Sequence, residues 1–148
     1  MADAATISVT ATMLPDEIAK TIDGSMTLAP ADANHKWYYK LTSVSNSSTD
    51  LMAGYFTDYL AIDDDTAPIA ITTSDTVAFL FIQNTDASNL VYLNWNGAAA
   101  ASAGNLYVGA GETWYGRLGV TTMGAVHAIS SASTVTCIVI ALMDDISV

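Results

Sequence analysis

Apolar and polar residues alternate along three segments in the first third of the chain, at 6–12, 21–28 and 35–44. Successive side chains of a strand point to opposite faces, so a period of two predicts strands with one apolar face each. The apolar positions with this spacing are Ile7, Val9 and Ala11 in the first segment, Ile22, Met26 and Leu28 in the second, and Trp37, Tyr39 and Leu41 in the third.

Strand signals continue through the rest of the chain at short intervals. Residues 51–62 are rich in aromatic side chains, and residues 77–82 are apolar throughout, as is typical of a central strand buried on both faces. Turns are predicted at Asn96–Gly97 and around Gly109 and Gly111. The remaining segments that we expect to be strands are 90–95, 105–108, 112–118, 125–130 and 134–143.

Nine or ten short strands with turn residues between them predict an all-β fold, an antiparallel β-sandwich or jelly roll. Strong helix formers are scarce, and only residues 14–20, with Pro15 near the start, favour a helical turn. No linker divides the chain, so we expect one domain over residues 1–148. Residues 1–13 have two interpretations: the first strand of the sandwich, or an extended arm that adds a strand to a neighbouring subunit.

The charge balance excludes some partners. The chain has 148 residues, 51% of them hydrophobic and 13% charged, which is too apolar for a disordered protein. Four basic residues stand against fifteen acidic ones, giving a net charge of −11. Nucleic-acid binding needs Lys and Arg at phosphates, and docking on an anionic membrane needs the same residues, so we expect neither partner. With no secretion signal visible, we expect synthesis in a cytoplasm.

Residue types that carry catalysis or bind metals are few and scattered. His35 and His127 have no other ligand type at metal-binding spacing, and Cys137 lies in an apolar run where a thiol acts as a small hydrophobic group. No nucleophile elbow or dinucleotide-binding fingerprint occurs. We therefore expect a protein without catalytic residues, metal or cofactor.

An acidic cluster is the sharpest charge feature of the sequence. Asp63, Asp64 and Asp65 are consecutive, with Asp58 just upstream. Crowded carboxylates can bind Ca²⁺, but the spacing of an EF-hand loop is absent. The sequence favours a solvated turn and leaves calcium binding open.

An aromatic cluster is the best candidate for an interaction site. It comprises Trp37, Tyr38, Tyr39, Tyr55 and Tyr59. Tyr and Trp are common at interfaces because they bury a large area and keep a polar tip, and they also stack on sugars. Since strand neighbours point to opposite faces, we expect part of this cluster in the core and part at an interface.

Residues 77–145 also carry a resemblance to a known class of proteins. The elements are Phe-Leu-Phe-Ile-Gln-Asn-Thr-Asp at 79–86, Leu-Val-Tyr-Leu-Asn-Trp-Asn-Gly at 90–97, and Val-Gly-Ala-Gly-Glu-Thr-Trp at 108–114. Val-His-Ala-Ile-Ser-Ser at 126–131 and the run 134–145 follow. This pattern of strands and turns resembles small virion proteins of tailed bacteriophages, of the capsid decoration (cement) type with a jelly-roll or β-sandwich fold.

The resemblance implies a non-enzymatic structural protein that stabilises the assembled capsid. Its expected partners are the major capsid protein and further copies of itself, with a trimer favoured over a dimer, and its expected place is the outer capsid surface. Strong acidity suits the exterior of a shell better than its DNA-facing side. The alternatives are a phage tail or receptor-binding accessory protein that recognises host glycan, and a cellular glycan-binding module.

Overall fold

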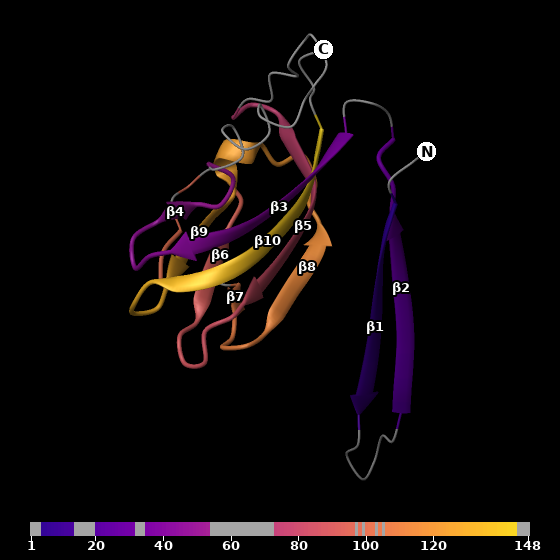
Figure 1. Cartoon of the computed structure of the whole chain (residues 1–148), viewed down its shortest axis with the longest axis horizontal. Helices are drawn as coiled ribbons and strands as arrows, with labels where there is room; N and C mark the ends of the chain where they lie inside the picture. The colour runs from indigo at the N-terminus through magenta and orange to yellow at the C-terminus, as the bar shows by residue number, and fades with distance from the viewer. Residues whose placement is uncertain are drawn as a thin grey trace. The chain divides into compact units, whose positions relative to one another are not determined.

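The computed structural model describes residues 4–13, 20–31, 35–53, 73–96, 98, 100–102, 104 and 106–144. It is all-β, as the sequence predicts, and its strands form one two-stranded and two four-stranded antiparallel sheets (Figure 1). The chain divides into two compact units, Met1–Ala33 and Asn34–Val148.

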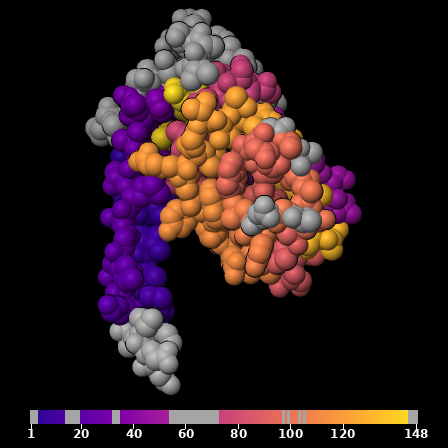
Figure 2. All heavy atoms as spheres, turned by 180° about the vertical axis from the view of Figure 1, so that it is seen from behind, coloured from indigo at the N-terminus to yellow at the C-terminus, as the bar shows by residue number. Residues whose placement is uncertain are grey.

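The first unit contains a long β-hairpin. Strands β1 (Ala5–Met13) and β2 (Lys20–Leu28) pair antiparallel over their whole length, with Ala5 opposite Leu28 and Met13 opposite Lys20. Figure 2 shows this unit, in indigo and violet, as a narrow rod. The strands predicted at 6–12 and 21–28 are confirmed. Lys20 belongs to β2, and the rest of the helical turn expected at 14–20 lies outside the described residues.

The second unit contains two sheets. The first has the order β3-β10-β5-β8, and its strands are β3 (His35–Val44), β10 (Val135–Asp144), β5 (Thr76–Asn84) and β8 (Thr113–Arg117). The second has the order β4-β9-β6-β7, and its strands are β4 (Thr49–Asp50), β9 (His127–Ser130), β6 (Val91–Asn94) and β7 (Tyr107–Val108). The predicted glycine turn follows β7, and Gly111 has a φ of 71°, a conformation that favours glycine.

The hydrophobic core contains side chains from both four-stranded sheets, as the predicted β-sandwich requires. On strands such as β10, alternate residues point into this core, so the alternation along the strand buries one of its faces. Core residues of the first sheet include Tyr38, Val44, Leu80, Ile82, Cys137 and Val139, and those of the second include Val91, Leu93, Val108 and Ala128.

Two strand boundaries differ from the prediction. Residues 51–62 were expected to be a strand, but β4 ends at Asp50, whose Oδ1 accepts the backbone N–H of Met52 at 2.8 Å. Residues 54–62 of this prediction lie outside the described residues. A side chain that binds its own backbone in this way competes with the ladder and turns the chain. Ala125 was expected in a strand, and it lies in the 3-10 turn η1 (Met123–Ala125) instead, because its N–H donates to the Thr122 carbonyl at 3.0 Å.

A buried asparagine joins the end of β5 to two loops. Asn84 is fully buried, and its Nδ2 donates to the carbonyl oxygens of Asn89 at 2.7 Å and Gly109 at 3.0 Å. Its Oδ1 accepts the backbone N–H of Asp86 at 3.0 Å. Buried polar groups are tolerated where they are hydrogen-bonded, and this one holds together segments far apart in the sequence.

The loop after β5 is held by a carboxylate. Asp86 Oδ1 accepts the backbone N–H groups of Asn89 at 2.7 Å and Ser88 at 2.8 Å. These bonds, that from Asn89 first, hold the pKa of the Asp86 carboxyl below its usual value because they favour the ionised form. Asp86 therefore has a structural role in this turn.

Candidate interaction surface

The sheet β3-β10-β5-β8 has a second face, opposite the core. On β10, Cys137, Val139 and Ala141 are core residues, so Ile138 and Ile140 point the other way. The strand register aligns this face into three rows. We call it the outer face, and its rows are Leu41-Ile138-Gln83-Thr113, Tyr39-Ile140-Phe81-Tyr115 and Trp37-Leu142-Phe79-Arg117.

The outer face is apolar, and its first two rows reach solvent, whereas Phe79 and Leu142 of the third row are buried. Its middle row has an aliphatic or aromatic side chain on all four strands. Tyr39 and Leu41 are exposed, and Ile138, Ile140 and Phe81 are half-buried. Arg117, on the edge strand β8, is the one charged residue in the three rows. Apolar neighbours on adjacent strands contact one another, which gives a largely uncharged surface.

The predicted aromatic cluster divides between core and surface. Tyr38 is buried in the core, and Tyr39 is exposed on the outer face. Trp37 is half-buried, with its ring edge-on to Phe79 at a centroid distance of 6.4 Å and an angle of 74°. Tyr55 and Tyr59 lie outside the described residues. Of the candidate interface residues, the structure therefore brings Trp37 and Tyr39 to one surface and assigns Tyr38 to packing.

Several outer-face residues were not singled out from the sequence. The surface is completed by Ile138, Ile140, Phe81 and Tyr115. The first three lie in apolar runs of the sequence, and Tyr115 lies in a short segment next to a predicted turn. An apolar run does not reveal which of its faces covers the core. Strand β5 is central, as predicted, although Phe81 is only half-buried. The position of β10 between β3 and β5 brings these residues together, and the sequence alone does not reveal it.

Two tryptophans meet at the edge of the sandwich. Trp95, after β6, and Trp114, on β8, stack with ring centroids 4.9 Å apart and an interplanar angle of 28°. Both are partly buried and pack against the core. Gly116 leaves room for this pair, because a Cβ there would lie 3.1 Å from the Trp114 ring. The rings join the two sheets and cover each other's faces.

The histidines and the cysteine have structural surroundings. His127 Nε2 lies 3.1 Å from the Gly124 carbonyl, and Nδ1 lies 3.2 Å from Ser48 Oγ. His35 Nε2 lies 3.7 Å from Asp144 Oδ2, its partner across β3 and β10. Burial, with a smaller effect of the Asp86 charge, raises the pKa of the Cys137 thiol to about 12. This thiol is therefore protonated and unreactive at neutral pH.

The described residues contain no group of three His, Cys, Asp or Glu side chains that could hold a metal ion. The acidic cluster of Asp58, Asp63, Asp64 and Asp65 lies outside the described residues. In the part of the chain that the structure describes, no helix is long and apolar enough to cross a membrane.

Comparison with known proteins adds no relative. No protein-family model, curated protein or solved structure matches this chain.

Proposed function

We propose that the protein is a non-enzymatic structural protein of a bacteriophage virion, which binds the assembled capsid and stabilises it. The outer face of the first sheet is the contact surface in this proposal. The major capsid protein and further copies of this chain are the partners, and the outer capsid surface is the location. The observation that carries the proposal is the exposed apolar middle row on this face, centred on Tyr39 and Ile140.

The size and charge of the outer face suit a flat protein contact. The two rows that reach solvent extend over four strands about 4.8 Å apart and three residues of about 3.3 Å each, about 200 Å². Apolar side chains that lie together on a protein surface can mark a contact with another protein. Arg117 is the only charged side chain in the three rows, and interface centres are depleted of charge in the same way.

The mechanism is thermodynamic. A protein that binds the assembled shell and not its free subunits stabilises the shell by mass action. Tyr39 can contribute a large aromatic area at the centre of the contact, where such side chains dominate binding energy. The net charge of −11 keeps the rest of the protein solvated and suits the exterior of a particle.

Recognition of host glycan is the alternative function. A glycan groove presents exposed, coplanar aromatic rings to the sugar. Trp95 and Trp114 cover each other, so their inner faces are not open to a ligand. Tyr92 and Tyr107, on the second sheet, are inclined at 60°. These pairs give the alternative no specific support.

A binding experiment with a matched control tests the proposal. Tyr39 is 65% exposed on the outer face, and Tyr107 is 55% exposed on the second sheet, so replacing either by serine should leave the fold intact. We expect Tyr39→Ser combined with Leu41→Ser to weaken binding to heads that lack the protein by at least about tenfold. We expect Tyr107→Ser to bind as the parent does. Co-sedimentation with heads measures both.

Unchanged binding by the Tyr39 and Leu41 double variant would overturn the outer face as the contact. Binding to host glycan without binding to heads would favour the alternative function.

A further inference from the structure

The β1–β2 hairpin has one apolar and one polar face. Because the register pairs odd positions of β1 with even positions of β2, side chains of like character meet across the two strands. The apolar face comprises Ala5, Ile7, Val9, Ala11 and Met13 of β1 and Ile22, Gly24, Met26 and Leu28 of β2, with Lys20 at its end. The opposite face comprises Thr6, Ser8, Thr10, Thr12, Thr21, Asp23, Ser25 and Thr27.

The apolar face is open to solvent along much of its length. Val9 is 37% exposed and Ile22 is 54% exposed, and Met13 is also exposed. A two-stranded ribbon is marginally stable in water, and three or more strands with an apolar face are needed for independent stability. This hairpin forms a two-stranded sheet among the described residues. Additional strands would therefore stabilise it.

Strand β1 presents an unprotected edge. Its sequence, Ala-Thr-Ile-Ser-Val-Thr-Ala-Thr-Met, contains no charged residue, proline or glycine. Soluble proteins usually guard such edges with charges, proline or bulges. Strand β2, by contrast, contains Lys20, Asp23 and Gly24. Within the described residues β1 pairs with β2 alone, so its other edge has free hydrogen-bonding groups.

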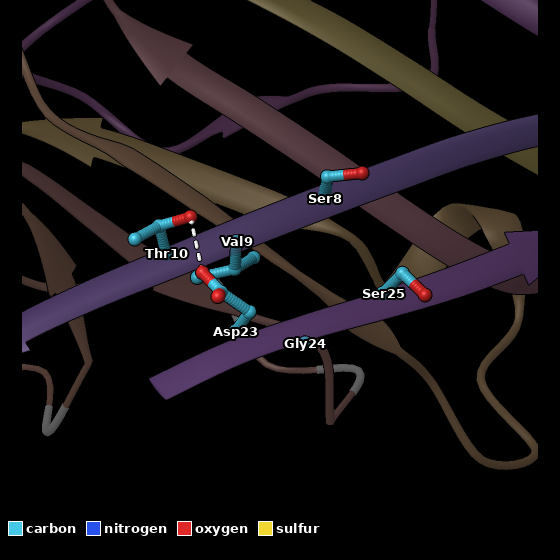
Figure 3. Close-up of a pocket in the computed structure, with 6 residues that line it drawn as sticks. All are labelled: Ser8, Val9, Thr10, Asp23, Gly24 and Ser25. Carbon is cyan, nitrogen blue, oxygen red and sulfur yellow. Dashed lines mark hydrogen bonds between the residues drawn. The ribbon is translucent and has the colours of Figure 1, made fainter. Parts of the chain in front are cut away.

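The polar face has one charged side chain, Asp23, and its hydrogen bond lies within the hairpin. The Thr10 hydroxyl donates to Asp23 Oδ1 at 2.8 Å (Figure 3). A shallow, open hollow lies around this pair, lined by Ser8, Val9, Thr10, Asp23, Gly24 and Ser25, which are labelled in Figure 3. No aromatic side chain lines the hollow, so it lacks the stacking surface of a glycan site. Of these features of the hairpin, the β1 edge is the one that suits a partner.

We propose that β1 pairs antiparallel with β1 of a second copy, about a two-fold axis at Val9. The combined sheet has the order β2-β1-β1-β2. Nine residues centred on Val9 make this register self-complementary, because Val9 meets Val9, Ser8 meets Thr10 and Ala5 meets Met13. The apolar face then continues across four strands, and serine and threonine continue across the other face, where Thr–Thr and Thr–Ser pairs stabilise antiparallel strands.

Charge favours this place for contact between two copies. Each copy has a net charge of −11, so most of its surface repels a second copy. Strand β1 brings no ionisable side chain into the contact. Four strands of about 30 Å give an apolar face of about 600 Å², twice that of one hairpin. A two-fold contact of this kind is isologous, the commonest symmetry among oligomers.

This inference deepens the proposed function, since it specifies how copies of the protein associate. A two-fold contact between hairpins joins two copies whatever their other contacts are. If the protein is a trimer, as the sequence favours, this contact joins a chain of one trimer to a chain of another. It is tested in solution without capsids, so its failure is separate from failure of capsid binding.

Disulfide cross-linking of the full chain tests the register. The native Cys137 is buried and gives no background in the folded protein. In the proposed pairing the two Val9 Cα atoms are about 4.5–5.5 Å apart, within the range of a disulfide. We expect mild oxidation of Val9→Cys to give mostly covalent dimer on a non-reducing gel. Ile22→Cys, on the same face of β2, should run as uncross-linked chain on the same gel because the two copies of residue 22 are separated by three strand spacings.

A charge variant gives a second readout. Val9→Lys places two ammonium groups opposite each other on the axis, and we expect it to weaken self-association about tenfold or more. Ile22→Lys should associate as the parent does, and sedimentation velocity measures both. Equal cross-linking at positions 9 and 22, or a parent protein that stays monomeric at high concentration, would overturn the proposal.

Discussion

Replacing Asn84 by alanine is expected to lower the free energy of unfolding by about 3 kcal/mol, and the melting temperature by about 10 °C. The substitution leaves the carbonyl oxygens of Asn89 and Gly109 and the N–H of Asp86 without the partners that the side chain supplies. An unsatisfied buried polar group costs about 1–3 kcal/mol, and several are created here. Denaturant titration followed by circular dichroism measures the change.

Asn94→Ala is the matched control for this prediction. Asn94 also makes a side-chain bond to a carbonyl oxygen, that of Ala98 at 2.7 Å, but this bond is exposed. Water replaces an exposed partner, so we expect a loss of about 1 kcal/mol or less. Equal losses for the two asparagines would show that the bonds of Asn84 do not hold the loops together.

Trp114→Ala is expected to cost about 3 kcal/mol, the lower end for a truncated tryptophan, because the ring is only partly buried. The loss includes the stack on Trp95 at 4.9 Å and the contacts that join β8 to the second sheet. We expect the variant to fold, with a lower melting temperature and changed tryptophan fluorescence. Trp114→Phe keeps an aromatic ring in the site and should lose less.

The two tryptophans should also be coupled. Trp95→Ala and the double variant complete a thermodynamic cycle, and residues in contact show coupling of about 0.5–3 kcal/mol. The loss in the double variant should be smaller than the two single losses together. Additive losses would mean that each ring is stabilised by the core alone.

The sequence predicted individual strands correctly where it carries a long alternating or apolar segment. The segment 35–44 matches β3 residue for residue, and 77–82 lies inside β5. The order β3-β10-β5-β8 did not follow, because it pairs segments far apart in the sequence, such as β3 with β10, for which the sequence has no local signal. Prediction also failed where a side chain captured the backbone, as Asp50 does for Met52.

The candidate surface was only partly predictable for a related reason. Alternation shows that Tyr38 and Tyr39 point to opposite faces, but not which of them is in the core. The answer depends on β10, whose residues opposite Tyr38 are buried and whose Ile140 lies beside Tyr39 on the outer face. The hairpin faces, in contrast, could be read from residues 6–12 and 21–28 directly.

We propose that the protein is a structural component of the capsid exterior. Quantitative mass spectrometry of purified heads, together with a reconstruction of the same particles, tests this proposal. We expect many copies in a fixed ratio to the major capsid protein, at symmetry-related positions on the outer surface. Heads that lack the protein, or a few copies confined to the tail, would contradict it.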